Sequence, residues 1–201
     1  MATAGIFLDK DGTLLVDVPY NADPARMRLA PGAAEALATF GGLGVPLVVV
    51  SNEGGLARGR LRGRDMVVIE RELARLFALH GATLAAFYFC PHEPPAAGSA
   101  LAGCTCRKPA PGLLRAAAKA QDVDLARSWM IGDILDDVDA GRRAGCRAIL
   151  IDNGNETLWQ RGPWRVPDHR VPGLAAAARI VAADFACAAA QERESVRDAI
   201  A

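Results

Sequence analysis

Two aspartates one residue apart, Asp9 and Asp11, follow a short apolar run in the segment IFLDKDGTL. Carboxylates this close repel each other, so they imply a cation that offsets their charge. With its charge offset, Asp9 could attack phosphorus as a nucleophile. Asp11, in a different environment, could protonate the departing oxygen and then activate water. A solvated acidic turn and a calcium loop are the alternatives, but Gly12 comes fourth from Asp9, where an EF-hand loop needs its glycine sixth.

Further polar residues come after later apolar runs of the chain. Ser51 and Asn52 end the run PLVVVSN, Lys108 comes after AAFYFC and a cysteine-rich stretch, and Asp133 follows WMIG. A hydroxyl at Ser51 and an amine at Lys108 suit the oxygens of a phosphate. Taken singly, a helix cap and a solvated lysine explain these two residues equally well. Three carboxylates meeting at one place favour Mg²⁺, which is often shared with a substrate phosphate.

The elements that must position these residues alternate between strand and helix patterns. Near-continuous apolar runs, typical of parallel strands covered on both faces, begin at Gly5, Pro46, Ala85, Ser128 and Arg147. Helical patterns lie between them and begin at Gly32, Asp65, Pro111 and Ile134. This rhythm predicts an α/β fold with a doubly wound, Rossmann-like parallel sheet of about five or six strands. Ligands bind at the carboxyl ends of such strands, so the polar residues should converge at one edge.

Length and charge narrow the class of protein. A chain of 201 residues suits one domain, residues 1–201, with a small inserted loop at residues 90–106. Lys and Arg total 23, equal to Asp and Glu, which leaves no basic footprint for nucleic acid. The N-terminal residues lack the pattern of a secretory signal. We therefore expect a cytoplasmic monomer that binds neither nucleic acid nor membrane. The alanine-rich residues 174–190 predict a further helix.

Four motifs, DKDGTL, VVVSN, CRKPAPG and IGDILDD, occur in the order found in the haloacid dehalogenase (HAD) superfamily of phosphatases, which this chain resembles. The resemblance implies that Asp9 is the nucleophile and Asp11 the general acid and base. It also implies that Asp9, the backbone of Asp11, and Asp133 hold Mg²⁺, with Asp137 supporting the site from behind these ligands. Residues 65–90 leave no room for a large cap domain, so we expect a minimal cap and an open site.

The cysteine-rich stretch predicts a second metal site. Cys90 and His92, then Cys104 and Cys106, form two close pairs that could close a tetrahedral Cys₃His zinc site. Four protein ligands leave no open position, so this zinc should be structural and should fix Arg107 and Lys108 over the active site. The alternatives are a disulfide, free thiols or a catalytic zinc. The number of cysteines is odd, five, which disfavours disulfides in a chain that we expect to be cytoplasmic.

The same loop resembles that of the D-glycero-D-manno-heptose 1,7-bisphosphate 7-phosphatases and the related histidinol-phosphatase domains. This narrower resemblance, carried over by position, gives a set of candidate substrate contacts. They are Thr13, Tyr20, Asn21, Asn52, Glu53, Arg107 and Lys108. The chain departs from the family pattern at Glu53, commonly glutamine, and at Ile134, often lysine or arginine.

Together these patterns predict a Mg²⁺-dependent phosphomonoester hydrolase that works through an aspartyl-phosphate intermediate. The predicted substrate is a D-glycero-D-manno-heptose 1,7-bisphosphate, from which the 7-phosphate is removed. A phosphatase for histidinol phosphate or another small sugar phosphate is the alternative among enzymes. A HAD-fold binding module without activity is the alternative from another class. Residues 153–170 contain two tryptophans and no recognised motif. We interpret them as a surface loop that packs its aromatic side chains, and part of a partner surface is the alternative.

Overall fold

The computed structural model describes residues 2–94 and 103–200, without the side chains of residues 192–196 and 198–200. Residues 95–102 of the predicted zinc loop therefore lie outside the described residues. Six strands form one sheet in the order β3-β2-β1-β4-β5-β6, and every neighbouring pair is parallel. The strands are β1 (Ile6–Leu8), β2 (Leu47–Asn52), β3 (Leu84–Cys90), β4 (Trp129–Gly132), β5 (Arg147–Ile151) and β6 (His169–Val171).

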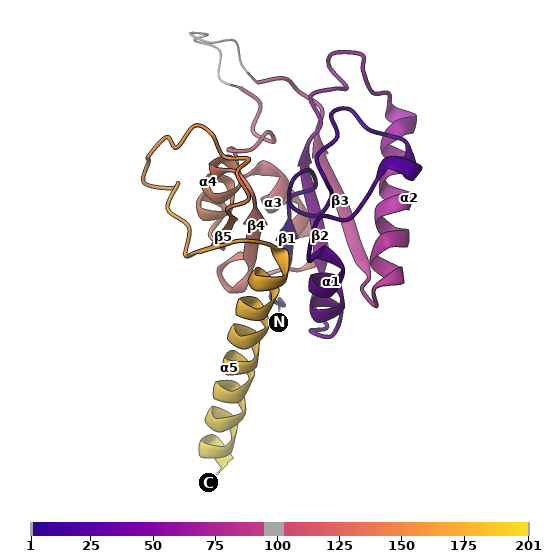
Figure 1. Ribbon diagram of the computed structural model, residues 1–201. Helices are drawn as coiled ribbons and strands as arrows, with labels where there is room; N and C mark the ends of the chain where they lie inside the picture. Colours follow the sequence, from indigo (N-terminus) through magenta and orange to yellow (C-terminus); the bar gives the residue numbers. More distant parts are fainter. Residues whose placement is uncertain (1, 95–102, 201) are drawn as a thin grey trace.

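Helices cover both faces of this sheet (Figure 1). They are α1 (Ala33–Gly41), α2 (Gly63–Leu79), α3 (Gly112–Gln121), α4 (Leu135–Ala144) and α5 (Leu174–Ile200), with short 3₁₀ turns η1 (Pro24–Arg26) and η2 (Leu125–Arg127). Helices α1, α2 and α5 bury apolar residues against one face, and α3 and α4 bury theirs against the other. The predicted doubly wound α/β architecture is confirmed.

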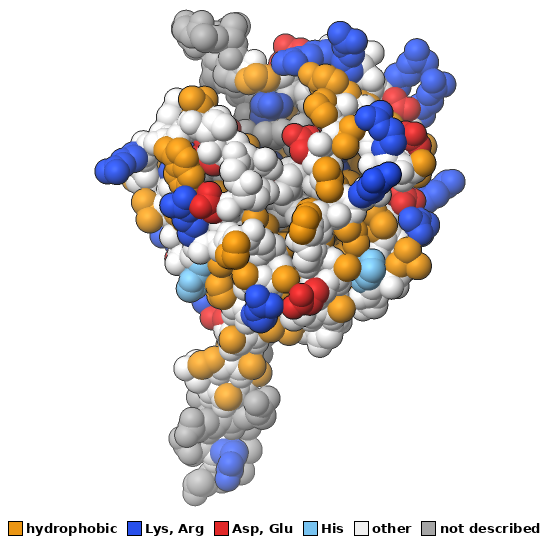
Figure 2. Space-filling view, in the orientation of Figure 1, with side chains coloured by type: hydrophobic (Ala, Val, Ile, Leu, Met, Phe, Trp, Pro, Cys, Tyr) orange, Lys and Arg blue, Asp and Glu red, His pale blue; other side chains and the backbone are white. Residues whose placement is uncertain are grey.

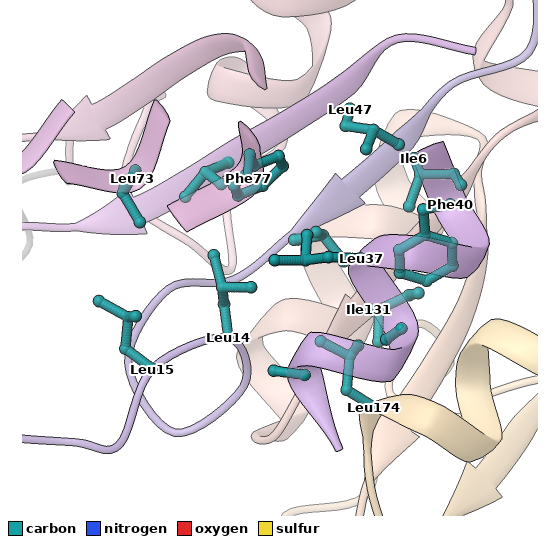
Figure 3. Packing of buried hydrophobic residues seen from close by; sticks show 14 of the residues in the cluster. Ile6, Leu14, Leu15, Leu37, Phe40, Leu47, Leu73, Phe77, Ile131 and Leu174 are labelled. Carbon is teal, nitrogen blue, oxygen red and sulfur yellow. The ribbon is translucent and has the colours of Figure 1, made fainter. Parts of the chain in front are cut away.

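Strand β1 shows why the predicted strands are apolar throughout. Ile6 and Leu8 face the core formed with α1, whereas Phe7 faces the α3 side, and all three are fully buried. Figure 3 shows Ile6 beside Phe40 and close to Leu37 of α1. Successive side chains of a strand point to opposite faces, so in a strand covered on both sides every side chain is buried and apolar residues are favoured at every position.

The strand order reverses at β1, which has β2 on one side and β4 on the other. This is the switch point at which open α/β sheets bind ligands. The loop after β1 is anchored there by Leu14 and Leu15, which are buried in the same core as α1 (Figure 3). Their backbone N–H groups both donate to the carbonyl of Lys10, at 3.1 and 2.8 Å. The residues between β1 and this anchor are thereby fixed at the sheet edge.

The C-terminal helix α5 packs its first turns on α1 and then extends past the sheet (Figure 1). It contains an 18-residue window, Leu174–Gln191, that is long and apolar enough to cross a membrane by length and composition, with a mean hydropathy of 1.4. Leu174, Ala177, Ala178 and Val181 of this window are buried in the core against the sheet. These contacts are those of a core helix in its first turns.

Candidate active site and metal centres

The carboxyl ends of β1, β2 and β4 surround a cavity of about 290 Å³. It contains the aspartate pair, the strand-end residues of β2 and β4, and the lysine that follows the cysteine-rich loop. The lining residues are Asp9, Asp11, Asp17, Ser51, Asn52, Lys108, Asp133, Ile134, Asp137 and Asn155. The structure thus brings the four sequence motifs together at one edge of the sheet.

Lys108 lies at the floor of this cavity and is 2% exposed. Its Nζ donates to Asp9 Oδ1, lies 2.7 Å from Asp137 Oδ1, and donates to the carbonyl of Val50 at 2.9 Å. Burial alone would lower the pKa of Lys108, but the charges of Asp137 and Asp9 outweigh burial and raise this pKa above its ordinary value. The ammonium group is therefore a fixed positive charge beside the proposed nucleophile.

Three buried carboxylates, those of Asp9, Asp133 and Asp137, each place an oxygen within 4.8 Å of the others. Burial, and then the charge of Asp9, raise the pKa of Asp133 to about 6. Lys108 contacts Asp9 and Asp137, but Asp133 receives hydrogen bonds only from neutral groups among the described residues. Hard oxygen donors with this uncompensated charge fit Mg²⁺, and a bound Mg²⁺ would supply the missing positive charge.

Both oxygens of the Asp133 carboxylate are held in place by side chains from other loops. Thr13 Oγ1 donates to Oδ1 at 3.0 Å, and Asn155 Nδ2 donates to Oδ2 at 2.7 Å. Gly12 passes so close that a Cβ there would lie 2.2 Å from Asp133 Oδ2. Its φ of +84° is also in the region that favours glycine. A glycine is therefore required between Asp11 and Thr13.

Asp137 is fixed because it caps the helix that follows the metal-site strand. The backbone N–H of Ile134 donates to Asp137 Oδ2 at 3.3 Å, and that of Leu135 donates to Glu156 Oε2 at 2.7 Å. A carboxylate in the first turn satisfies free N–H groups and is favoured by the helix dipole. This capping leaves Asp137 Oδ1 directed towards Lys108.

The Asp11 carboxylate lies apart from the three metal-site carboxylates. Burial raises the pKa of Asp11 to about 6, although the adjacent Lys10 charge opposes the shift. Lys10 Nζ lies 2.8 Å from Asp11 Oδ2 and 2.9 Å from Glu53 Oε1. Burial would lower the pKa of Lys10, but these two carboxylates raise it above its ordinary value. A carboxyl group with a pKa near neutrality can both give and take a proton.

The seven candidate substrate contacts divide into three groups. Asn52 and Lys108 line the cavity, and Arg107 lines a neighbouring one with Glu93 and Arg143. The other four lie outside the cavity: Thr13 bonds Asp133, Tyr20 accepts a hydrogen bond from Arg58, Asn21 accepts one from the backbone of Asp23, and Glu53 is buried against Lys10 and Ser51.

The four predicted zinc ligands converge at the end of β3. The three sulfur atoms of Cys90, Cys104 and Cys106 lie 3.2 to 3.5 Å apart, and His92 Nδ1 lies 3.5 and 3.3 Å from the sulfurs of Cys90 and Cys106. Ligands at Zn–S distances of about 2.3 Å form a tetrahedron with edges of about 3.8 Å. The cluster is slightly tighter than that, and it fits a four-coordinate zinc with no position left for water.

Backbone N–H groups hold two of the three cysteine sulfurs in place, and the pKa is lowered for Cys104 alone among the three thiols. The N–H groups of Arg107 and His92 donate to the sulfurs of Cys104 and Cys90, at 3.3 and 3.4 Å. Burial opposes ionisation of Cys104, but the bond from Arg107 and the neighbouring thiols lower its pKa to about 6. Arg107 also donates to the carbonyl of His92 at 2.8 Å. The cluster thus fixes the segment that leads into Lys108.

Sequence reasoning did not identify Asn153 and Asn155, which reach the site from the loop after β5. Asn153 Nδ2 donates to the carbonyl of Gly12 at 2.7 Å, and Asn155 lines the cavity and bonds Asp133. The rule that selected the polar residues after the other strands would have selected these two, because β5 lies next to β4 in the sheet.

A switch-point sheet with a strand-end aspartate pair, a buried lysine and a third acidic strand end defines a phosphatase of the HAD class. The chain matches the family described as HAD-hydrolase-like over residues 105–177. It is 35% identical over 150 residues to the D-glycero-beta-D-manno-heptose-1,7-bisphosphate 7-phosphatase of Pasteurella multocida, covering 74% of this chain and 82% of the relative. It is 36% identical over 185 residues to the D-glycero-D-manno-heptose-1,7-bisphosphate 7-phosphatase of Thermosynechococcus vestitus, covering 88% and 94%.

The structure agrees with these matches. It resembles the crystal structure of D,D-heptose 1,7-bisphosphate phosphatase from B. bronchiseptica complexed with magnesium and phosphate, with a TM-score of 0.76 and 34% identity. The match covers 89% of this chain and 98% of the other. The chain therefore belongs to the heptose 1,7-bisphosphate 7-phosphatase family of the HAD-like hydrolases.

Proposed function

We propose that this protein is a Mg²⁺-dependent phosphomonoester hydrolase that removes the 7-phosphate of a D-glycero-D-manno-heptose 1,7-bisphosphate. The observation that carries the chemistry is the position of Lys108 Nζ between Asp9 and Asp137, in a cavity that also holds Asp11 and Asp133. The family membership supports the substrate, because the matching relatives carry that name. The chain acts as one domain, residues 1–201, with a zinc loop inserted at residues 90–106.

The reaction has two steps, transfer of the phosphoryl group to Asp9 and its hydrolysis. In the first, Asp9 forms a bond to phosphorus while the bond from phosphorus to the sugar oxygen breaks, and Asp11 gives that oxygen a proton. In the second, Asp11 takes a proton from water as the water oxygen attacks phosphorus, which releases phosphate and restores Asp9. Lys108 holds the phosphoryl oxygens in both steps, and Ser51, whose hydroxyl proton is donated to Glu53, forms part of the wall of the phosphoryl site.

Asp9, the backbone carbonyl of Asp11, and Asp133 would hold Mg²⁺, and Asp137 would support it. When bound, Mg²⁺ would neutralise the excess negative charge of the carboxylates and the phosphoryl group. The zinc of the Cys₃His cluster has a structural role, because all four positions belong to the protein.

The surroundings of the cavity suit a phosphorylated sugar. Lys and Arg side chains gather over the upper end of α2 and the loop before it (Figure 2). That stretch contains four exposed arginines, Arg58, Arg60, Arg62 and Arg64. Two of them, Arg58 and Arg64, are paired with carboxylates, and exposed arginines on this side of the molecule favour the approach of anionic substrates. Zinc-binding thiols must stay reduced, which supports the cytoplasm as the location of the enzyme.

A comparison of substrates tests the proposal. Phosphate release with Mg²⁺ should be fastest from the heptose bisphosphate, and kcat/KM should be at least about tenfold lower for histidinol phosphate and for simple sugar monophosphates. Higher kcat/KM with histidinol phosphate would assign the chain to the alternative substrate. Equally slow release from every compound would reject both assignments.

A further inference from the structure

Lys10 and Glu53 form a buried ion pair beneath the catalytic cavity. Lys10 is 4% exposed and Glu53 is 5% exposed, and neither residue lines the cavity. Lys10 Nζ lies 2.9 Å from Glu53 Oε1 and 2.8 Å from Asp11 Oδ2. The same Glu53 oxygen accepts a hydrogen bond of 2.8 Å from the hydroxyl of Ser51. The pair thus joins Asp11, after β1, to Ser51, at the end of β2.

Stability alone does not explain this arrangement. Two apolar residues of similar size stabilise a core at least as well as a buried ion pair, because the pair must be removed from water. The ion pair instead fixes the orientation of the side chains that it contacts. Each of its outer contacts is to a residue that lines the substrate cavity, Asp11 on one side and Ser51 on the other.

We propose that Lys10 and Glu53 are positioning residues that orient the Asp11 carboxyl group for proton transfer and hold the Ser51 side chain at the cavity wall. Lys10 occupies Oδ2 of Asp11, which leaves Oδ1 to exchange a proton with the leaving oxygen. Glu53 holds Lys10 in that position and stays out of contact with substrate. This inference rests on the proposed function, since it concerns the proton step of that reaction.

The proposal predicts a dependence on the leaving group that a merely structural role would not produce. A sugar alkoxide is a poor leaving group and needs a proton from Asp11 as the bond breaks. A p-nitrophenolate leaves without one. Misorientation of Asp11 should therefore slow phosphoryl transfer from a sugar phosphate and spare transfer from p-nitrophenyl phosphate. The parameter to compare is kcat/KM, which reports the steps up to transfer to Asp9.

The test is Lys10→Met, assayed with saturating Mg²⁺ on heptose bisphosphate and on p-nitrophenyl phosphate. We expect kcat/KM to fall about 100-fold for the sugar phosphate, within the usual range for general acid catalysis, and less than about fivefold for the aryl phosphate. Lys10→Arg keeps the charge and should recover most of the loss. Lys119→Met, which removes an exposed lysine of α3, is the matched control and should change neither rate.

Lys10→Met leaves the buried Glu53 carboxylate without a counter-charge and could prevent folding. The double variant Lys10→Met, Glu53→Gln removes both charges, and its glutamine oxygen still accepts from Ser51. It should fold and show the same leaving-group-dependent loss. Equal losses on the two substrates, or no loss on either, would overturn the proposal. Failure of the proposed function would be seen separately, as a wild-type enzyme that does not release phosphate from the sugar bisphosphate.

Discussion

Asn52 and Lys108 exchange two hydrogen bonds across the active site. Asn52 Nδ2 donates to the Lys108 carbonyl at 3.1 Å, and the Lys108 N–H donates to Asn52 Oδ1 at 3.0 Å. The amide at the end of β2 therefore fixes the backbone from which the Lys108 ammonium reaches Asp9. The residues lie 56 positions apart in the chain, and the Cys/His cluster fixes the Lys108 segment from its other side.

Asn52→Ala should lower kcat/KM about 10- to 100-fold, because a displacement of a catalytic group by about 1 Å can cost that much. A double-mutant comparison shows whether Asn52 acts through Lys108. If it does, Asn52→Ala combined with Lys108→Met should be no slower than Lys108→Met alone. Fully additive losses would mean that Asn52 acts independently, for instance by contacting substrate itself.

Asp9→Asn should reduce kcat by about 10⁴-fold or more, since removal of a nucleophile commonly has that effect. The fold should survive. Asparagine keeps the volume of Asp9, and Lys108 retains Asp137 and the Val50 carbonyl as partners. Phosphate release and the thermal midpoint Tm measure the two effects. Asp122→Asn is the matched control, because it sits at a left-handed position that asparagine tolerates, on the exposed end of α3.

The sequence allowed prediction of the sheet edge because the local signals there are strong. Each catalytic motif begins where an apolar run ends, and parallel strands bring their carboxyl ends to one side. Strand β6 carries no such signal, since its three residues are His169, Arg170 and Val171 and two of them are exposed. It pairs with β5 through its backbone, which the side-chain pattern does not reveal.

The environment of Glu53 could not be read from its neighbours in sequence. Its counter-charge, Lys10, lies after another strand, and the pair exists only because β1 and β2 are adjacent. Asn155 could have been selected as a candidate because it follows β5, but its bond to Asp133, across 22 positions from an irregular loop, could not be predicted. Where strands end can be predicted from a sequence pattern. Which loop side chains meet beyond those ends depends on tertiary packing.

Asn155→Ala should weaken Mg²⁺ binding about tenfold, because residues that orient metal ligands commonly contribute 10- to 100-fold to affinity. The variant loses the 2.7 Å bond to Asp133 Oδ2 and keeps the bond from Thr13 to Oδ1. Isothermal titration of Mg²⁺ into the metal-free protein measures the affinity directly. Gln160→Ala, which changes an exposed residue of the same segment, serves as the control. Unchanged Mg²⁺ affinity would show that Asn155 does not support the metal site.

Mg²⁺ binding should weaken below about pH 6, the pKa to which burial and Asp9 raise Asp133. A protonated carboxyl group is a poor ligand, so the apparent affinity should fall up to about tenfold per pH unit below that point. In the metal-free protein the raised pKa of Asp133 affects stability in the opposite direction, because it favours the folded state at low pH. Folded Asp133 binds a proton between about pH 4 and 6 that the unfolded chain does not, so its contribution to the free energy of unfolding decreases as pH rises through that window.

A pKa shift of this size lowers the free energy of unfolding of the metal-free protein by roughly 3 kcal/mol at neutral pH. Bound Mg²⁺ should offset this loss. The increase in Tm on addition of Mg²⁺ should therefore be large near pH 7.5 and small near pH 5. Scanning calorimetry at the two pH values, with zinc retained, measures it. An equal increase at both would mean that Asp133 is not titrating at the metal site.

Removal of one zinc ligand should destabilise the loop more than it impairs the chemical step. Cys104→Ser breaks the Cys₃His set and the sulfur contact to the Arg107 N–H. A loss of about 2 kcal/mol would lower Tm by about 4–8 °C in a chain of this length. Metal analysis should find about one zinc per chain in the wild type and much less in the variant. Cys187→Ser, which changes an exposed cysteine of α5, is the control and should alter neither value.

The effect on catalysis separates a structural zinc from a catalytic one. If zinc only fixes the segment that leads to Lys108, the variant should keep measurable Mg²⁺-dependent turnover at low temperature and lose it early on heating. A catalytic zinc would instead remove turnover at every temperature, including those at which the variant is folded. We expect the first result, because three thiolates and one imidazole fill the tetrahedron and leave no position at which zinc could activate water.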